Sequence, residues 1–284
     1  MRAAGALERD LAVRCPDDMA ADFLGGLNVT TLAKHRAMRG LVLRRANRRI
    51  PGAYTYEIMR AKFIDEIVLG GVAAGLDELI LLGAGLDSRP YRLAEQLRGV
   101  RVIEVDHPAS QASKRARLCR LLGREPDHVT FVKIDFTRDD LDAALAAAGH
   151  ERSARTLFIW SGVSPYLPEE AVAGVLSWVG GHGSPRTSIV FDACWAEVID
   201  GSREYFGAAE LRRHVAKTGE PLRWGIPEGR VRETLSSFGL QAERSLDSEE
   251  GRIAYLKRSD GTLHDQPFGF GVLVHARAAD SRAR

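Results

Sequence analysis

Residues Glu78–Asp87, with the sequence ELILLGAGLD, decide the expected fold. The β-rich run Glu78–Leu82 predicts a short strand, and Gly83 and Gly85 predict a sharp turn that lets a ligand approach the main chain. A helix that follows such a turn offers free amide groups in its first turn. Many α/β proteins use glycine-rich turns, so this stretch alone also fits a tight strand-to-helix turn without a ligand.

Strands and helices alternate around this turn. Strands are expected at residues 78–82, 101–105, 129–134, 156–160 and 187–191, and helices at 55–74, 88–97, 108–122, 139–148 and 169–179. Strict alternation predicts a Rossmann-like α/β fold, a mostly parallel sheet with helices on both faces. Two more runs, 241–246 and 268–276, are expected to form an antiparallel pair at the sheet edge, which gives seven strands.

Acidic residues follow the second and third expected strands. Asp106 comes about twenty residues after the glycines, where a carboxylate can accept hydrogen bonds from both hydroxyls of a ribose. Asp135 and Phe136 follow the third strand, and a carboxylate beside an aromatic ring suits the amino group and the face of an adenine. Both acids also fit caps, Asp106 before Pro108 and Asp135 before Thr137.

The turn lacks the third small residue of a dinucleotide-binding sequence. Ser88 stands where a glycine or alanine would allow close helix packing beside a pyrophosphate. A cofactor without a pyrophosphate is therefore preferred, and S-adenosylmethionine offers a ribose to Asp106 and an adenine to Asp135. A nicotinamide-dependent oxidoreductase is the leading rival from another class, and the missing glycine argues against it.

Four blocks of sequence stand in order along the chain. They are Arg60–Asp65 (RAKFID), Leu81–Leu93 (LLGAGLDSRPYRL), Glu104–Pro108 (EVDHP) with Lys114, and Trp160–Pro168 (WSGVSPYLP). Together they resemble the leucine carboxyl methyltransferase-like family of class I methyltransferases, which includes bacterial polyketide O-methyltransferases of the tetracenomycin type. The resemblance covers residues 60–192 and implies the fold expected above, with S-adenosylmethionine as the cofactor.

The resemblance also implies a set of cofactor-binding residues. Arg60 would meet the carboxylate of the cofactor, with Lys62 as a weaker stand-in, and Gly83 and Gly85 would line its methionine part. Asp106 would hold the ribose. The predicted cofactor site is Arg60, Gly83, Ala84, Gly85, Asp106, His107, Asp135, Phe136 and Ser161.

One position departs from the family pattern. The family usually has a glutamate where this chain has Ser161, so the anionic contact near the amino group of the cofactor is either absent or supplied elsewhere. Asp87 and Asp192 are the candidates to supply it. Because of this change, a non-catalytic module that binds S-adenosylmethionine stays an alternative.

The expected activity is S-adenosylmethionine-dependent O-methylation of a hydroxyl or carboxyl group on a small molecule, such as an aromatic polyketide or another secondary metabolite. A carboxyl methyltransferase of a peptide C-terminus is the alternative. A carboxylate acceptor needs only orientation, whereas a hydroxyl acceptor gains from a general base. Tyr166, Tyr205, His214 and His107 are the candidate bases, and none of them stands in a motif.

Composition narrows the class of protein further. The 40 basic and 38 acidic residues give a net charge of +2, which predicts no nucleic-acid partner. Cys15, Cys119 and Cys194 lie far apart, so neither a disulfide framework nor a metal site is expected, and a reducing cytoplasm fits. No apolar stretch is long enough for a signal peptide or a membrane span. The chain is therefore expected to be soluble and cytoplasmic, with a homo-oligomer left open.

No repeat or low-complexity linker divides the chain, so residues 1–284 are expected to form one domain. Its parts are a helical cap (1–54), a cofactor-binding core (55–194), a helical insert on the substrate side (195–239) and the edge strands (240–284). The second half of the cap is crowded with arginines, which are interpreted as a solvated helix face rather than an anion-recognition surface; they are Arg36, Arg39, Arg44, Arg45, Arg48 and Arg49. The aromatic residues of the insert either wall a flat ligand or belong to the core; they are Trp195, Tyr205, Phe206 and Trp224.

Overall fold

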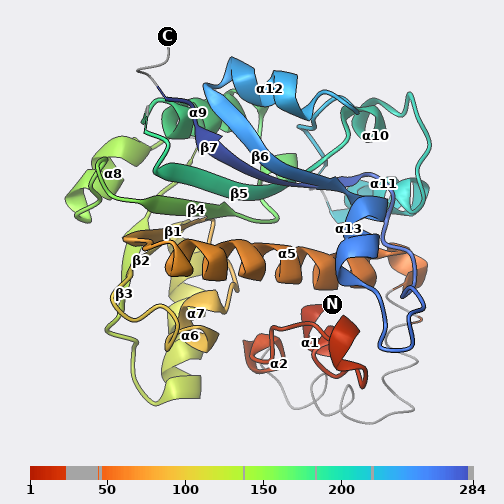
Figure 1. The fold of residues 1–284 in the computed structure, drawn as a ribbon, viewed down its shortest axis with the longest axis horizontal. Coiled ribbons are helices and arrows are strands. Elements are labelled where there is room, and N and C mark those ends of the chain that lie inside the picture. Colours follow the sequence, from red (N-terminus) through yellow and green to blue (C-terminus); the bar gives the residue numbers. More distant parts are fainter. Residues whose placement is uncertain (24–43, 45–46, 137, 183, 219–220, 281–284) are drawn as a thin grey trace.

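The computed structural model describes residues 1–23, 44, 47–136, 138–182, 184–218 and 221–280. Their centre is a seven-stranded sheet in the order β3-β2-β1-β4-β5-β7-β6 (Figure 1). The first five strands are parallel, and β7 is antiparallel to both of its neighbours. The predicted Rossmann-like sheet and its antiparallel pair are thus confirmed. The strands are β1 Glu78–Leu82, β2 Arg101–Asp106, β3 Val129–Lys133, β4 Thr156–Trp160, β5 Thr187–Cys194, β6 Leu240–Asp247 and β7 Gly271–Ala278.

The central strands have almost entirely apolar sequences because helices cover both of their faces. Every residue of β1 and β4 is buried, as expected for parallel strands between two helical layers. Parallel pairing sets Leu82 beside Val105, and Trp160 beside Phe191. The carboxyl ends of β1, β2 and β4 therefore meet at one edge of the sheet, which is where a ligand site is expected in open α/β sheets.

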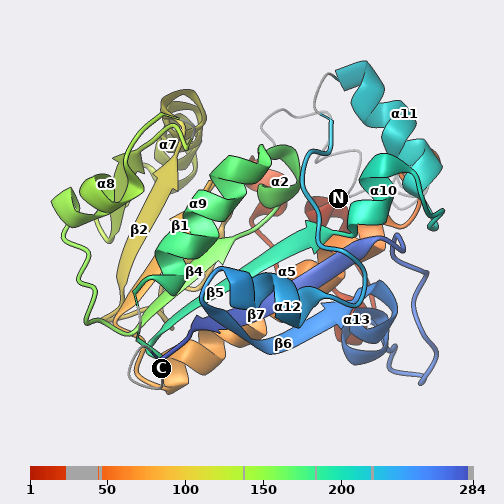
Figure 2. The same cartoon turned by 90° about the horizontal axis from the view of Figure 1, so that it is seen from above.

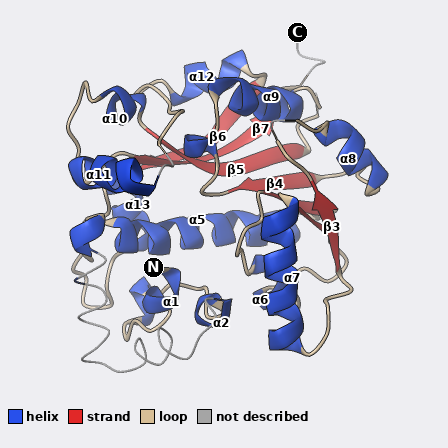
Figure 3. Cartoon of the chain, turned by 180° about the vertical axis from the view of Figure 1, so that it is seen from behind, coloured by secondary structure: helices blue, strands red, loops and turns tan. Residues whose placement is uncertain are grey.

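Two hydrophobic cores lie on opposite faces of the sheet. The long helix α5 (Ala53–Ala73) buries one of its faces, including Ile58, Phe63 and Val68, against the first. The second is filled by α9 (Glu169–Gly180) and α12 (Val231–Ser237) on the other face (Figures 1 and 3). The other helices are α1 Arg2–Gly5, η1 Leu11–Val13, α2 Ala20–Phe23, α6 Arg89–Arg92, α7 Pro108–Leu122, α8 Leu141–Ala147, η2 Ser164–Tyr166, α10 Ala196–Asp200, α11 Ala208–Thr218 and α13 Ser248–Tyr255.

The N-terminal segment packs on α5, on the side that faces away from the sheet (Figure 1). It contains the short helices α1, η1 and α2, and residues 24–43, 45 and 46 of the expected cap lie outside the described part of the chain. Of the cap arginines, Arg48 and Arg49 are exposed, in line with a solvated surface. The positions Arg36, Arg39 and Arg45 fall outside the described residues.

The structure differs from the sequence-based prediction at two helices. The helix expected at 88–97 is only the single turn α6, and a series of turns follows it. The side chain of Arg89 explains this, because it is buried and bound to Asp65 and Asp87, which fixes the turn to α5. Helix α13 was not expected. In the described residues no helix is long and apolar enough to cross a membrane.

The expected helical insert is helical only in part. Helices α10 and α11 lie at the carboxyl end of β5 (Figure 2). An extended stretch then returns to the sheet, where Ile226 forms a bridge with Trp195, and α12 packs beside β6. The insert therefore places α11 beside the strand ends.

Candidate functional site

A cavity of about 440 Å³ opens at the carboxyl ends of the parallel strands. Its volume lies in the range of small-molecule sites. All nine residues of the predicted cofactor site line it, which are Arg60, Gly83, Ala84, Gly85, Asp106, His107, Asp135, Phe136 and Ser161. We call it the cofactor cavity. Parallel pairing explains the gathering, because it brings together strand ends that are far apart in sequence.

The glycine turn forms one wall of the cofactor cavity. Gly83 (φ 65°) and Gly85 (φ 45°) both have left-handed backbone conformations that other residues rarely adopt. The amides of Gly83 and Ala84 donate to the carbonyl of Val105 at 2.8 and 3.1 Å, which ties the turn to β2. A Cβ on Gly83 would lie 2.7 Å from a methyl group of Val163. Glycine is therefore required here by both conformation and space.

Asp106 stands between the turn and the cavity and is 8% exposed. Its Oδ2 accepts the amide hydrogen of Gly85 at 2.6 Å, and its Oδ1 accepts that of His107 at 2.7 Å. Each carboxylate oxygen keeps a lone pair for a ligand hydroxyl. The N-cap of α7 is His107, whose Nδ1 accepts from the amide of Ala109, so the alternative in which Asp106 caps this helix is wrong.

Asp135 and Phe136 follow β3 and line the cofactor cavity. The carbonyl of Asp135 accepts from the amides of Arg138 and Asp139, and its own amide donates to the side chain of Asp139 at 2.8 Å. Asp135 therefore opens a turn and lines the cavity as well. The ring of Phe136 packs against the hydrophobic core. Thr137, named in the cap alternative, lies outside the described residues.

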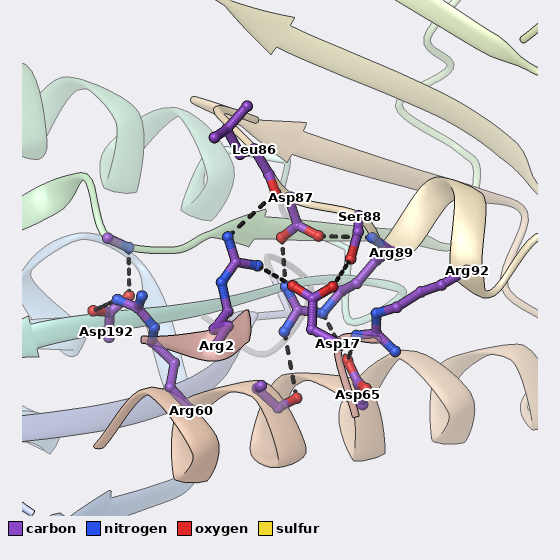
Figure 4. Close-up of polar contacts among 12 residues, drawn as sticks. Arg2, Asp17, Arg60, Asp65, Leu86, Asp87, Ser88, Arg89, Arg92 and Asp192 are labelled. Carbon is purple, nitrogen blue, oxygen red and sulfur yellow. Dashed lines mark hydrogen bonds and ion pairs between the residues drawn. The ribbon is translucent and has the colours of Figure 1, made fainter. Parts of the chain in front are cut away.

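Arg60 on α5 lines the cavity and is held by two carboxylates. Figure 4 shows its contact with Asp192. Its guanidinium lies 2.7 Å from Asp192 and 2.6 Å from Glu57. Burial alone would lower the pKa of Arg60, but these two carboxylates raise it well above its ordinary range. Arg60 is therefore a fixed cation. Lys62 donates instead to the carbonyls of Ala12 and Tyr255 and is not part of the cavity lining, so it does not replace Arg60.

The two carboxylates considered in place of the family glutamate differ in position. Asp87 lines the cofactor cavity but forms a buried ion pair with Arg89. Phe191 pairs with Trp160 across the sheet, and Asp192 and Ser161 are the residues that follow them. Asp192 therefore lies beside Ser161. Asp192 accepts the amide of Gly162 at 2.6 Å and lines a second pocket rather than the cofactor cavity.

A network of polar contacts connects the glycine turn to α5 and to the N-terminal segment (Figure 4). Arg89 binds Asp87 and Asp65, and Arg2 binds Asp17 at 2.7 Å and the carbonyl of Leu86 at 3.2 Å. Arg2 also lines the cofactor cavity. The sequence analysis missed Arg2, since an arginine beside the first residue carries no pattern that separates it from a solvated charge.

A second pocket of about 300 Å³ adjoins the cofactor cavity, and Arg60 and Gly162 line both. We call it the acceptor pocket. It lies between α5, η2, the end of β5 and α11, in the region where the sequence analysis expected the substrate. Its lining includes Tyr56, Glu57, Tyr166, Asp192, Cys194, Leu211, Phe268 and Phe270.

The four candidate bases fall in different places. Tyr166 lines the acceptor pocket, and burial, followed by the charge of Asp192, raises the pKa of its hydroxyl. The hydroxyl of Tyr205 donates to Glu228 at 2.9 Å in a separate pocket. His214 on α11 lines neither the cofactor cavity nor the acceptor pocket. His107 lines the cofactor cavity and caps α7. The structure thus brings only Tyr166 to the acceptor pocket.

Of the two alternatives for the aromatic residues of the insert, a ligand wall or the core, the structure favours the core for the two tryptophans. Trp195 and Trp224 belong to the buried core, and Phe206 is an exposed side chain. The walls of the acceptor pocket come instead from Tyr56, Phe268 and Phe270. Within the described residues, no group of three or more His, Cys, Asp or Glu side chains could hold a metal ion.

The fold and the cofactor cavity define a Rossmann-like protein with a site for a nucleoside-containing ligand. The sequence profile of the family described as leucine carboxyl methyltransferase matches residues 1–180. The chain belongs to the leucine carboxyl methyltransferase family. The family predicted from the four blocks is therefore confirmed.

Several curated relatives share much of the chain. A Streptomyces coelicolor protein is 38% identical over 218 residues, or 72% of this chain and 74% of that protein. A Frankia alni protein is 34% identical over 248 residues, or 84% of each chain. A Bacillus subtilis protein is 28% identical, and the match spans 63% of its length. All three carry the name "Putative S-adenosyl-L-methionine-dependent methyltransferase".

Two solved structures show the same fold at low sequence identity. One, from Thermobifida fusca and described as a "putative methyltransferase", has a TM-score of 0.59 and 16% identity, and the match covers 91% of this chain and 92% of that one. The other, a DUF574 family protein from Streptomyces avermitilis, has a TM-score of 0.59 and 13% identity, with 90% and 94% covered. At this identity the likeness concerns the fold alone.

Proposed function

We propose that this protein is an S-adenosylmethionine-dependent O-methyltransferase that acts on a small molecule. One observation carries the proposal: the cavity that gathers all nine predicted cofactor residues shares Arg60 and Gly162 with a second, aromatic-walled pocket. Methyl transfer needs two ligands side by side with their reacting atoms aligned. Two adjoining pockets at the strand ends provide that arrangement.

The relatives are named as S-adenosyl-L-methionine-dependent, which agrees with the cofactor predicted from the sequence. The residues of the cofactor cavity fit this cofactor. Asp106 has free lone pairs for the ribose hydroxyls, and Asp135 and Phe136 suit the adenine. Arg60 and Arg2 are the cations that line the cavity beside Arg89, and they suit the carboxylate of the amino-acid end. The conformation of Gly83 and Gly85 keeps side chains out of the turn.

When bound, the cofactor supplies a methyl group whose bond to sulfur breaks, leaving its electron pair on sulfur, as the acceptor oxygen bonds to the carbon. The chain then has to orient the acceptor and exclude water. Glu57 and Asp192 are the carboxylates of the acceptor pocket. Burial favours a neutral Glu57, but Arg60 and Arg2 lower its pKa, so it is ionised at neutral pH. We assign to these carboxylates the proton that a hydroxyl acceptor releases.

Two acceptor classes remain from the sequence analysis. A small aromatic acceptor, such as a polyketide, is favoured by the stacked rings of Tyr56, Phe268 and Phe270 in the acceptor pocket. A peptide carboxyl group is the second candidate, and the name of the family supports it. The oxidoreductase alternative loses its basis because the chain belongs to a methyltransferase family. A non-catalytic module stays an alternative that activity measurements decide.

The proposal is tested by calorimetry and by an acceptor screen. We expect the protein to bind S-adenosylhomocysteine and to give no binding heat with NADH. Phenolic and carboxylic compounds incubated with S-adenosylmethionine should then show, for at least one class, a mass gain of one methyl group. Binding of NADH without binding of S-adenosylhomocysteine would contradict the proposal, and binding without any methylated product would favour the non-catalytic module.

A further inference from the structure

The acceptor pocket contains a buried hydroxyl to which the proposed function gives no role. Tyr56 on α5 lines this pocket and is 2% exposed. Its hydroxyl has no hydrogen-bond partner among the residues that the structure describes. Buried polar groups nearly always have a partner, because an unpaired one loses its hydration without compensation. A ligand in the pocket is the natural partner for this group.

Neighbouring groups hold the ring of Tyr56 in place. It stacks on Phe268 with ring centroids 4.0 Å apart, and Phe268 stacks in turn on Phe270 at 4.2 Å. The Tyr56 ring also lies against Gly271, where an added Cβ would be 2.3 Å from its Cε2 and 2.7 Å from Cε2 of Phe268. The ring of Tyr56, and with it the hydroxyl, is therefore held in a fixed position at the wall of the pocket.

The Tyr56 hydroxyl acts as a hydrogen-bond donor. Burial, followed by the nearby charge of Asp192, raises its pKa well above the ordinary range. The group thus keeps its proton at neutral pH. Such a hydroxyl can donate to an acceptor atom of a ligand, such as a hydroxyl or carbonyl oxygen, and donation is the role that we assign to it.

The charges of the acceptor pocket favour a neutral ligand. Arg60 is the one cation among the described residues that line it, and Asp192 and Glu57 already bind it at 2.7 and 2.6 Å. Because Arg60 is assigned to the carboxylate of the cofactor, an anionic acceptor would lack a cation of its own and would be repelled by Asp192 and Glu57. A phenol meets neither cost, because it is neutral and can donate to a carboxylate.

Tyr56 lies where we expect a part of the ligand that does not react. Arg60 and Gly162 line both pockets, so the methyl group is delivered near them, whereas Tyr56 lines only the acceptor pocket of the two. Resting on the proposed function, we propose that Tyr56 donates a hydrogen bond to a second oxygen of a neutral aromatic hydroxyl acceptor, distinct from the oxygen that is methylated. Tyr56 is thereby a specificity-determining residue.

Three naphthalene probes and the complex with S-adenosylhomocysteine test this inference by calorimetry. The wild-type complex should bind 2,7-dihydroxynaphthalene more tightly than 2-naphthol, and 2-naphthoate most weakly. In the variant Tyr56→Phe, affinity for 2,7-dihydroxynaphthalene should fall about three- to tenfold, the usual effect of one neutral hydrogen bond. Affinity for 2-naphthol and for S-adenosylhomocysteine should stay the same. A merely structural role would weaken both naphthols alike.

Tyr255→Phe is the matched control, because it removes a tyrosine hydroxyl outside both pockets, one bound to Glu66. It should leave the ratio of the two naphthol affinities unchanged. The inference is overturned if Tyr56→Phe keeps the wild-type ratio, if 2-naphthoate binds as tightly as the diol, or if a protein that binds S-adenosylhomocysteine binds none of the probes. Failure of the wild type to bind S-adenosylhomocysteine would instead overturn the proposed function, and this inference with it.

Discussion

At the scale of single residues, Asp106 both lines the cofactor cavity and holds the chain around it in place. Its carboxylate lines the cofactor cavity, and it also accepts the amides of Gly85 and His107. The glycine turn and the start of α7 are thus held in place by the group expected to bind the ribose. Binding and local structure therefore depend on the same side chain.

Asp106→Ala should weaken binding of S-adenosylhomocysteine about 10- to 100-fold, since hydrogen bonds to a charged group contribute about 1.5–3 kcal/mol. Because two main-chain amides lose their acceptor, the midpoint of thermal unfolding should fall as well. Calorimetry and a thermal melt measure the two effects. Asp106→Asn, which keeps one acceptor oxygen, should retain more of both; unchanged binding in the alanine variant would show that the ribose site lies elsewhere.

Gly83→Ala should lower the free energy of unfolding by at least about 1–2 kcal/mol, the cost of a left-handed conformation for a residue with a Cβ. The added Cβ also meets Val163 at 2.7 Å. Part of the loss should therefore disappear when the substitution is made in a Val163→Ala background. Chemical denaturation of the four proteins of this double-mutant cycle measures the coupling, and additive losses would show that no contact with Val163 exists.

At the scale of elements, the strands were predictable because buried parallel strands are short apolar runs between glycines and polar caps. Helix α13 was missed, although Asp247 and Glu250 form the capping box that starts it and that pattern is visible in the sequence. The length of α6 was overestimated because the buried contacts of Arg89 connect it to α5. Contacts between distant segments leave no local periodicity.

A histidine pair at the opposite end of the sheet predicts a pH-dependent stability. His150 binds Glu78 of β1 at 2.6 Å, and its Nε2 lies 3.1 Å from Nε2 of His182, which follows α9. Burial is the main cause that lowers the pKa of His182. The unfolded chain therefore binds more protons than the folded one, so stability is lost as the pH falls below the unfolded pKa of about 6.5 toward the lower folded value.

Thermal melts at pH 7.5 and 5.5 check this expectation. The loss of stability between the two should be smaller in His182→Gln than in the wild type, by about 1.4 kcal/mol for each unit of pKa difference sampled. Burial also lowers the pKa of His275, so some pH dependence persists in both proteins and acts as an internal reference. Equal losses in the two proteins would refute a role for His182.

At the scale of the whole molecule, the sequence predicted the cofactor cavity more fully than the acceptor pocket. Most of the cavity lining follows strands, and a strand end can be located from local pattern. The acceptor pocket is built from α5, β5, α11 and the segment before β7, so its members, such as Tyr56 and Phe268, meet only in the folded chain. No spacing in the sequence joins them.

Cofactor binding should stabilise the entire domain, because the cofactor cavity joins strand ends, α5 and the N-terminal segment. At a concentration 100 times its Kd, S-adenosylhomocysteine should contribute about 2.7 kcal/mol, which raises the midpoint of thermal unfolding by roughly 5–10 °C for a domain of this size. A fluorescence melt with and without the ligand measures the shift. NADH at equal concentration is the control, and an equal shift with both would contradict a specific site.

The insertion of β7 between β5 and β6 has a consequence for how the protein forms during synthesis. β7 follows all the other strands in the chain, yet it pairs with β5 over seven residues from Ser188 to Cys194. Until it emerges from the ribosome, β5 has an open edge and β6 has no neighbour, and such edges attract other chains. The nascent sheet can therefore close only after residues 271–278 have left the ribosome, and β5 keeps an open edge until then.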